Sequence, residues 1–347
     1  MQKLSLSLFF CLAFMLQVKA QQKEYSIINI GFYNLENLFD TIHQQGVNDY
    51  EYLPTAKKRY TSLVYNDKIN RLASVIAELG TNYSSDGVAL LGVSEIENRG
   101  VLEDLCNSKG LKGRNYQIAH FDSPDARGVD VGLLYNPKYF TVDTSAALYV
   151  EMPAAADGYK GKTRDVLWVK GKLLGEVYHV FVNHWPSRYG GSSASANRRA
   201  AAANVCRQTI DSIMRKEPNA NIVVMGDLND NPTDASVTKV LRTAANIPKA
   251  LNGTLFNPWE NIYRGGTGTL AYQDAWALFD QIIISQHVTD KNPEKYYYYK
   301  ASIYKRDEMI QDSGRYKGYP KRTFDFDRYV SGYSDHFPVY ITLVKPQ

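Results

Sequence analysis

Short runs of mostly apolar residues, separated by polar and turn-forming residues, recur along most of the chain. They are rich in Val, Ile, Leu and Tyr and are bounded by Gly, Asp, Asn or Pro, which is the pattern of buried β-strands. We therefore expect a protein built largely on sheets. The predicted strands cover residues 25–33, 88–93, 129–135, 166–173, 177–183, 222–225, 281–284 and 337–343.

Three segments between these runs have the spacing of helices. Apolar residues recur at three- and four-residue intervals in 57–79, residues 194–214 are rich in alanine and end before Pro218, and residues 234–245 follow Pro232, which suits a helix start. Helices mixed with neighbouring strands indicate packed sheets covered by helices, an α+β or α/β sandwich. Since no repeat and no Pro/Ser/Gly-rich linker divides the chain, we expect one domain.

The first twenty residues differ from the rest of the chain. Lys3 precedes an apolar stretch over residues 4–16, which is shorter than the roughly 20 residues of a membrane-spanning helix. Val-Lys-Ala at 18–20 is an A-x-A-like cleavage pattern. We therefore expect residues 1–20 to be a signal peptide that is cleaved near Ala20.

Cys11 lies inside this apolar stretch, and lipidation of that cysteine as a membrane anchor is the alternative. The Leu-Phe-Phe that precedes Cys11 lacks the small residues expected before a lipidated cysteine. We expect a single domain over 21–347 without a transmembrane segment, exported to the periplasm or the extracellular space. Cys106 and Cys206 form one disulfide or stay buried free thiols, and the sequence leaves that choice open.

The charge balance narrows the classes of function. The chain has 40 Lys and Arg against 36 Asp and Glu, a net charge of +4, and Lys3 and Lys19 of the expected leader carry two of these charges. A uniformly basic nucleic-acid coat protein is thereby excluded. The hydrophobic share of 44% and the charged share of 22% are those of an ordinary globular protein.

Acidic, amide and histidine residues stand where the predicted strands begin or end. Strand ends hold side chains rigidly while neighbouring loops admit a substrate, so catalytic groups are often found there. Each residue alone has a structural explanation as a turn, a cap or a core group, but the whole set is harder to explain in that way. The set is Asn34, Glu36, Glu95, His184, Asp227, Asn229, Asp280, Asp335 and His336.

The oxygen-bearing side chains of this set suit a hard divalent cation. Mg²⁺ takes oxygen ligands, keeps several waters and bridges one or two carboxylates to a phosphate. The two histidines fit better as proton carriers and as hydrogen-bond donors to a phosphate. Zinc held by two histidines and an aspartate is the competing interpretation, although H-E-x-x-H and paired-cysteine motifs are lacking.

Six motifs, in order, resemble those of the endonuclease/exonuclease/phosphatase superfamily, which includes pancreatic-type deoxyribonuclease, apurinic endonucleases, inositol polyphosphate 5-phosphatases and neutral sphingomyelinases. The resemblance covers about residues 27–344. Y-N-L-E-N-L-F-D at 33–40, together with R-G-V-D-V-G-L-L-Y at 127–135, is most similar to the secreted bacterial branch of the superfamily. The motifs are Y-N-L-E-N-L-F at 33–39, L-G-V-S-E-I-E-N at 91–98, N-H-W-P-S at 183–187, M-G-D-L-N at 225–229, F-D-Q-I at 279–282 and S-D-H-F-P-V at 334–339.

This resemblance implies a fold and a metal. The fold is an α+β, four-layer α/β/β/α sandwich of two packed mixed sheets flanked by helices. The reaction is hydrolysis of a phosphate ester with Mg²⁺, and Mn²⁺ and Ca²⁺ are the alternative ions. Glu95 is implied as the main metal ligand, with Asn34, Glu36 and Asp335 as further ligands.

The resemblance also implies roles for the catalytic residues. Asp227 would position and deprotonate the attacking water, and Asn229 would hold that water or a phosphate oxygen. His336, oriented by Asp280, and His184 would donate hydrogen bonds to the scissile phosphate and transfer protons. Such a site works mainly by stabilising the charge that develops on the phosphoryl oxygens.

Three arginines are candidate substrate contacts. Nuclease members of the family usually have a phosphate-contacting tyrosine before the strand at 130–135, where this chain has Ala-Arg-Gly; Arg127 either supplies that contact or is an ordinary surface arginine. Arg188 and Arg199 follow His184 in a Gly-rich loop and at a helix start. They favour an anion there, or they belong to a flexible loop and a solvated helix.

A second basic segment, residues 295–322, has eight basic and three acidic residues interleaved with tyrosines. Basic groups with stackable rings suit nucleic acid, although alternating tyrosines also suit an amphipathic strand. We expect a monomer that acts on a phosphodiester, with nucleic acid as the first candidate.

Three classes of function follow from these patterns. An exported Mg²⁺-dependent nuclease is favoured over a phosphatase or phosphodiesterase that acts on inositol-phosphate-like or phospholipid head groups. A non-catalytic relative is disfavoured, because Glu95, Asp227 and His336 are all present. An open groove flanked by Arg127 and Arg199 would support the nuclease, and a pocket roofed by residues 305–322 would support the phosphatase.

Overall fold

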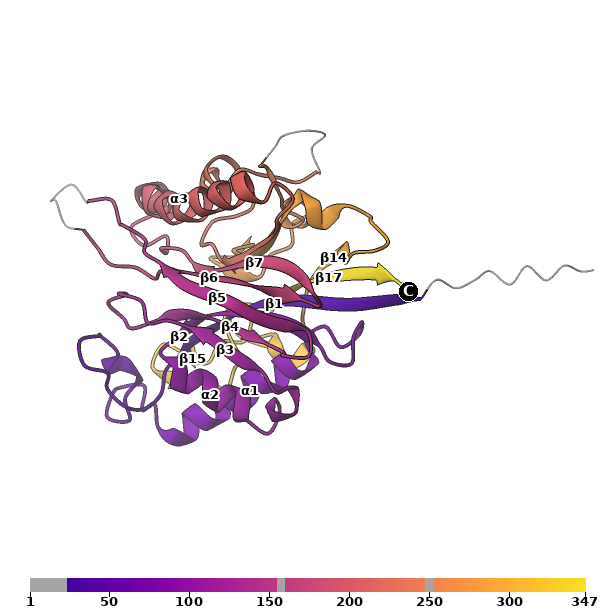
Figure 1. Cartoon of the computed structure of the whole chain (residues 1–347). Coiled ribbons are helices and arrows are strands. Elements are labelled where there is room, and N and C mark those ends of the chain that lie inside the picture. The colour runs from indigo at the N-terminus through magenta and orange to yellow at the C-terminus, as the bar shows by residue number, and fades with distance from the viewer. Residues whose placement is uncertain (1–23, 155–159, 247–252) are drawn as a thin grey trace, which may run out of the picture.

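The computed structural model describes residues 24–154, 160–246 and 253–347. The expected signal peptide at residues 1–20 lies outside the described residues. Within the described ranges, a six-stranded and a seven-stranded sheet pack face to face, and helices cover their outer sides (Figure 1). The predicted four-layer sandwich of two mixed sheets is thereby confirmed.

The six-stranded sheet joins the two ends of the described chain. Its central strand, β1 (Tyr25–Leu38), pairs antiparallel with β17 (Val339–Pro346) and parallel with β2 (Val88–Ile96). The strand order is β14-β17-β1-β2-β4-β3. The other three strands are β3 (Gln117–His120), β4 (Asp130–Tyr135) and β14 (Tyr297–Ile303).

The seven-stranded sheet contains the middle of the chain, in the order β5-β6-β7-β8-β13-β10-β9. Two short ribbons, β11 with β12 and β15 with β16, stand apart from both large sheets. The strands of the large sheet are β5 (Phe140–Leu148), β6 (Val166–Leu173), β7 (Glu176–His184), β8 (Asn221–Asp227), β9 (Thr243–Ala244), β10 (Leu255–Phe256) and β13 (Asp280–Ser285). The ribbon strands are β11 (Leu270–Tyr272), β12 (Ala275–Ala277), β15 (Phe324–Asp325) and β16 (Arg328–Tyr329).

Helices form the two outer layers. Figure 1 shows α1 and α2 on the outer side of the six-stranded sheet and α3 on the outer side of the seven-stranded sheet. The α-helices are α1 (Ser62–Glu78), α2 (Arg99–Asn107), α3 (Ser192–Lys216) and α4 (Trp259–Arg264). Short 3₁₀ turns are η1 (Tyr50–Tyr52), η2 (Lys112–Arg114), η4 (Gln286–Thr289) and η5 (Asp307–Met309).

The third predicted helix, 234–245, is wrong. Only the π-helical turn η3 (Ser236–Val240) forms there, and β9 follows it. Arg242 has a φ of 62°, which ends the helical geometry, and its carbonyl oxygen accepts a hydrogen bond from the backbone N–H of Leu255. Pairing of β9 with β10 therefore outweighs the local helix signal.

Apolar side chains fill the three spaces between the four layers. On β8, Val223 and Met225 face the other sheet, while Ile222 and Val224 face α3. A strand that is covered on both faces needs this continuous apolar run. The sheets also approach closely at Gly92, where a Cβ would lie 2.4 Å from the sulfur of Met225.

Both cysteines of the described chain are buried free thiols. Cys106 lies in α2, and Cys206 lies in α3, where its thiol donates to Asn183 Oδ1 at 3.0 Å. Burial raises the pKa of each thiol to about 12. Among the described residues, no helix is long and apolar enough to cross a membrane.

Candidate active site

Three neighbouring strands of the seven-stranded sheet bring polar side chains together in one row. His184 of β7 lies opposite Asp227 of β8, and Asp280 of β13 lies opposite Asp227 on its other side. The strand register therefore places all three side chains at one edge of the sheet. Close strand approach also requires Gly226, because a Cβ there would lie 2.3 Å from the carbonyl oxygen of Asn183.

A β-bulge in the other sheet brings Glu95 to the same place. The pairing of β2 with β4 shifts register between Ser94 and Ile96, and Glu95 between them has a φ of 57°. Bulges of this kind redirect a side chain. Glu95 Oε2 accepts a hydrogen bond from the backbone N–H of Asn37 at 3.0 Å, which fixes the carboxylate.

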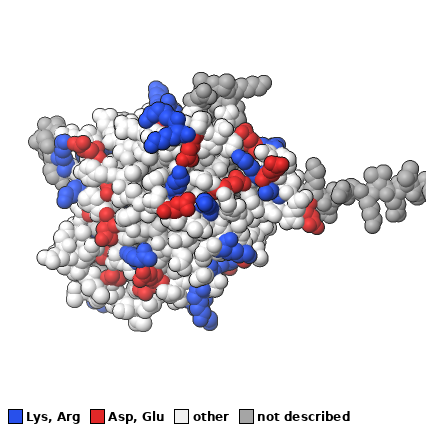
Figure 2. Space-filling view, viewed as in Figure 1, with Lys and Arg blue, Asp and Glu red and all other residues white. Residues whose placement is uncertain are grey.

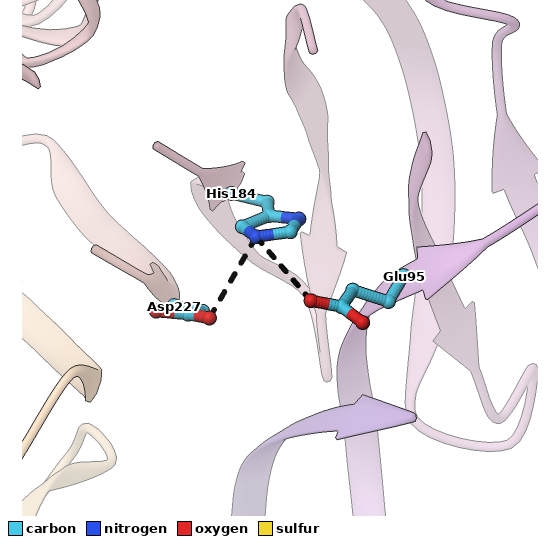
Figure 3. Close-up of side chains that lie close together, drawn as sticks. All are labelled: Glu95, His184 and Asp227. Atoms are coloured by element: carbon cyan, nitrogen blue, oxygen red, sulfur yellow. Dashed lines mark ion pairs between the residues drawn. The ribbon is translucent and has the colours of Figure 1, made fainter. Parts of the chain in front are cut away.

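Figure 3 shows His184 between the carboxylates of Glu95 and Asp227. His184 Nε2 lies 3.7 Å from Glu95 Oε1 and 3.7 Å from Asp227 Oδ2. Asn34 of β1 joins the two carboxylates, since its Nδ2 donates to Glu95 Oε1 at 3.3 Å and to Asp227 Oδ2 at 3.0 Å. One ligand atom from each of Glu95, His184 and Asp227 thus lies within 4.8 Å of the others.

His336 forms a second group with Asp280 and Asp227. Its Nδ1 lies 2.7 Å from Asp280 Oδ2, and its Nε2 lies 3.9 Å from Asp227 Oδ2. Burial lowers the pKa of His336, but the carboxylates of Asp280, Asp227 and Asp335 outweigh burial and hold that pKa well above its usual value. His336 is therefore a protonated imidazolium at neutral pH.

His184 has the opposite protonation state. Burial, then the positive charges of Arg164, Arg127 and His336, hold the pKa of His184 well below its usual value. Its Nδ1 is buried and has no hydrogen-bond partner among the described residues. The site therefore combines one neutral and one charged imidazole.

Asp227 stands at the centre of both groups. Burial raises its pKa to about 7; the charge of His336 opposes this rise, while the carboxylates of Asp280 and Glu95 add to it. The backbone N–H of Asn229 donates to Asp227 Oδ1 at 3.0 Å. Crowded carboxylate oxygens that resist ionisation are what a bound divalent cation stabilises, so this donor set fits Mg²⁺.

The other predicted ligands lie at the border of the site. Asp335 is partly exposed, with its carboxylate 3.9 Å from His336 Nε2. Glu36 Oε2 accepts from the backbone N–H of Thr323 at 2.7 Å, and the Glu36 carbonyl oxygen accepts from Lys68 Nζ. Among the described residues, Glu36 does not belong to any group of candidate metal ligands.

Glu36 belongs instead to a buried ion cluster behind the site. Burial raises its pKa to about 7, Asp335 adds to this rise, and Lys68 opposes it. Asn34 Oδ1 accepts from the backbone N–H of Glu36 at 2.8 Å, so the cluster is bonded to the residue that joins the two carboxylates. The sequence did contain a signal for Lys68, because it falls on the apolar side of α1 with Tyr65 and neighbouring core residues.

Two of the predicted substrate arginines are bound by acidic residues. Arg188 donates to the Asn229 carbonyl oxygen at 2.8 Å, to Asp230 at 3.0 Å and to Asp234 at 2.6 Å. Arg199 is fully buried, with its Nε 2.7 Å from Asp230 Oδ1. The prediction that Arg199 lines an open anion-binding loop is therefore not supported, because its charge compensates Asp230 inside the protein.

Arg127 is the predicted substrate arginine that keeps an exposed guanidinium, 47% accessible. Its backbone N–H donates to Asp125 Oδ1 at 3.0 Å, and Asp125 Oδ2 accepts from buried Arg164 at 3.0 Å. Arg164 also donates to the carbonyl oxygens of His184 at 3.0 Å and Trp185 at 2.6 Å. Arg164 is not among the predicted site residues, since a single arginine before an apolar strand gives no signal in the sequence.

Asn229 helps hold the same backbone. Its side-chain Nδ2 donates to the Trp185 carbonyl oxygen at 2.9 Å, and its φ of 50° turns the chain sharply after β8. The arrangement can position a water near Asp227, bind a cation beside Glu95 and donate a proton or hydrogen bond from His336. These are the components of metal-assisted hydrolysis.

Comparison with known proteins identifies the family. Residues 29–345 match the Endonuclease/Exonuclease/phosphatase family. The chain belongs to the endonuclease/exonuclease/phosphatase family. This family member is a hydrolase that acts on phosphate ester bonds. No curated protein matches it by sequence.

Solved structures share the fold at low sequence identity. An endonuclease/exonuclease/phosphatase family protein from Bacteroides thetaiotaomicron is 16% identical, with 93% of this chain and 99% of that chain covered at a TM-score of 0.54. The mannosyl-6-phosphatase Bt3783 of the same species is 15% identical, with 91% and 99% covered at 0.55. Humanised TDP2 of D. rerio is 15% identical, with 91% and 98% covered at 0.52.

Proposed function

We propose that this family member is a Mg²⁺-dependent phosphoesterase in which Asp227 activates water. The observation that carries the proposal is the convergence of Glu95, Asp227 and His336 from two sheets onto one buried site. Glu95 would hold the cation, with Asp335 as a second carboxylate at the border of the site. When bound, Mg²⁺ neutralises charge on the phosphoryl oxygens.

Asp227 is the base of this proposal. A pKa of about 7 suits a group that accepts a proton from water near neutral pH. Asn34 Nδ2 and the Asn229 backbone N–H each donate to one of its oxygens at 3.0 Å, which fixes the orientation of the carboxylate. Positioning of this kind accounts for much of the barrier reduction in hydrolysis.

The two histidines divide the remaining work. His336, held protonated by Asp280, donates from Nε2 to the phosphoryl group as negative charge develops. His184 stays neutral, so it contacts the phosphate without adding a second positive charge. The pKa of His336 is raised and that of His184 is lowered, and neighbouring titratable groups whose pKa values differ in this way are typical of acid–base sites.

A small phosphorylated molecule is the substrate that the geometry supports best. Arg199 is buried, so it does not flank an open groove. A cavity of about 410 Å³ borders Asp335 instead, and residues 311–322 contribute much of its wall. Figure 2 shows basic and acidic side chains interspersed on one face, without a broad basic track there.

Nuclease activity on a polynucleotide is the second candidate. This activity is favoured by Arg127, because its guanidinium is exposed and lies close enough to His184 to lower the pKa of that histidine. The exposed charge could pair with a backbone phosphate.

Export and a monomeric state stay predictions from the sequence. Cell fractionation of an expressing strain and light scattering of the purified chain test these two predictions.

The decisive experiment measures Mg²⁺-dependent hydrolysis of bis-p-nitrophenyl phosphate by the purified chain. Asp227→Asn and His336→Ala should each remove nearly all activity, while Asp307→Asn, which changes an exposed aspartate, should leave it unchanged. Circular dichroism establishes that each variant is folded. Activity that resists EDTA and survives in both site variants would refute the proposal.

A substrate panel then separates the two candidate functions. Phosphate release from sugar, nucleoside and inositol phosphates supports the small-molecule candidate. Cleavage of plasmid DNA or RNA without such release supports the nuclease. Sphingomyelin in the same panel tests a phospholipid head group.

A further inference from the structure

The cavity beside Asp335 has a strongly basic lining that the proposed chemistry does not use. Its wall comes from the segment 311–325, from residues 328–335 and from Ala271. Its volume of about 410 Å³ falls within the range of small-ligand sites, roughly 300–1,000 Å³. The charged residues of the lining are Arg315, Lys321, Arg322, Arg328, Asp325 and Asp335.

Two of the four basic side chains have acidic partners, and two do not. Arg328 lies 3.2 Å from Asp325, and Arg322 lies 3.6 Å from Asp335. In the described part of the chain, no carboxylate oxygen lies within 4 Å of the charged nitrogens of Arg315 or Lys321. The cavity therefore keeps two uncompensated positive charges, which favour a dianionic group such as phosphate.

The wall that presents these charges is held by backbone contacts. The Lys321 N–H donates to the Met309 carbonyl oxygen at 2.8 Å, and the Lys321 carbonyl oxygen accepts from the Tyr333 N–H at 2.8 Å. Gly332 passes so close to the segment at 321–322 that a Cβ would lie 1.8 Å from the Arg322 carbonyl oxygen. A fixed wall lowers the entropy lost when a ligand binds.

The aromatic part of the lining orders the arginines. The guanidinium carbons of Arg315 and Arg322 lie 5.7 Å and 5.8 Å from the ring centroid of Tyr316. Tyr319 also lines the cavity, and its hydroxyl donates to Asp274 at 2.6 Å. The ring of Tyr316 attracts both positive charges, which keeps the two guanidinium groups beside one another at the cavity.

We propose that this cavity binds a second phosphate group of the substrate while the scissile phosphate lies at Asp227. The inference rests on the proposed phosphoesterase function. It also names a substrate class for that function: small organic molecules that carry two phosphate groups. Asp335 links the two places, since it lines the cavity and its carboxylate lies 3.9 Å from His336 Nε2. A neighbouring phosphate of a nucleotide chain has the same chemistry, so the test includes both sources.

The test compares kcat/KM for matched substrates that differ by one phosphate. Adenosine 3′,5′-bisphosphate is compared with adenosine 5′-monophosphate, and 5′-phosphorylated thymidine dinucleotide with the unphosphorylated dinucleotide. The doubly phosphorylated member of at least one pair should be favoured by about tenfold, mainly through KM, as expected for one additional charge-assisted contact. The pair that shows the preference identifies the source.

The variants separate this proposal from the general function. Arg315→Gln with Lys321→Gln should reduce the preference to about twofold or less and leave kcat/KM for the singly phosphorylated substrate unchanged. Lys317→Gln, an exposed lysine of the same segment outside the cavity, is the matched control. Equal kcat/KM within both pairs, with Mg²⁺-dependent activity present, overturns the cavity proposal alone. If the unmodified chain has no Mg²⁺-dependent activity on any of these substrates, the proposed phosphoesterase function is overturned as well.

Discussion

The pKa values of His184 and His336 show how neighbours control a side chain at the residue scale. Both imidazoles are buried, and burial lowers both pKa values. His336 faces three carboxylates that reverse this effect, whereas His184 faces the charges of Arg164 and Arg127, which add to it. A single residue type therefore provides a charged donor and a neutral contact in one site.

The pKa of Asp227 predicts how Mg²⁺ affinity depends on pH. Because this pKa is about 7, the Asp227 carboxyl group is mostly protonated at pH 6 and mostly ionised at pH 8, where its negative charge attracts a cation held by the neighbouring Glu95. The dissociation constant for Mg²⁺ should therefore be roughly tenfold higher at pH 6 than at pH 8. Isothermal titration calorimetry at the two pH values measures this change. Asp227→Asn should remove most of the dependence, and equal affinities at both pH values in the unmodified chain would contradict it.

The raised pKa of Glu97 predicts that the stability of the fold depends on pH, independently of cation binding. Burial raises its pKa to about 8, with Asp40, Asp49 and Asp130 adding to the rise. Between about pH 4.5 and 8, the folded chain keeps a proton that the unfolded chain releases. The resulting stabilisation is fully present below about pH 4.5 and is lost as the pH rises through 8.

Glu97→Gln tests this sign directly. From pH 5 to pH 8, the free energy of unfolding of the unmodified chain should fall relative to that of the variant, by up to about 1.4 kcal/mol per pH unit. Urea denaturation of both proteins at several pH values measures the difference. A difference that is constant with pH, or that grows in favour of the unmodified chain, would show that Glu97 is ionised in the folded protein.

At the scale of elements, the periodic patterns predicted eight strands of the two large sheets and the two long helices, but β3 and β5 were not predicted. The strand-end residues His184, Asp227 and Asp280 were also found, because adjacent strands bring their ends to one edge. The bulge that redirects Glu95 was not predictable, since it depends on the pairing of β2 with β4. The ion pair of Arg199 with Asp230 was not predictable from the residues near Arg199 either, because Asp230 lies 31 positions further along the chain, after the end of β8.

The buried pair of Arg199 and Asp230 predicts a structural role for α3. Arg199→Met removes the nearest cation of buried Asp230 and leaves Arg188 at 3.0 Å as its remaining cation, which costs about 1–3 kcal/mol of unfolding free energy. Arg198→Ala, at an exposed position of the same helix, should change stability by less than about 0.5 kcal/mol. Guanidinium denaturation measures both values. If Arg199 instead binds substrate, its replacement raises KM and leaves the denaturation midpoint unchanged.

At the scale of the whole molecule, the site depends on both sheets. Glu95 and Asn34 come from the six-stranded sheet, and His184 and Asp227 come from the seven-stranded sheet. One apolar layer with residues of both sheets lies between them. The first and last strands also pair along their length, and the Gln347 N–H donates to the Glu24 carbonyl oxygen at 2.9 Å. Neither sheet can therefore separate without breaking the candidate metal centre.

This dependence predicts that Mg²⁺ stabilises the entire fold against heat. A cation that binds only the native site adds about 2.7 kcal/mol at a concentration one hundred times its dissociation constant. Since the cation would lie between Glu95 of one sheet and Asp227 of the other, thermal unfolding should remain one transition, and all of it should shift upward with Mg²⁺ and return with EDTA. Differential scanning calorimetry measures the shift, and Glu95→Gln should abolish most of it. Two transitions, of which Mg²⁺ moves only one, would show that the sheets unfold independently and that the cation is held by a single sheet.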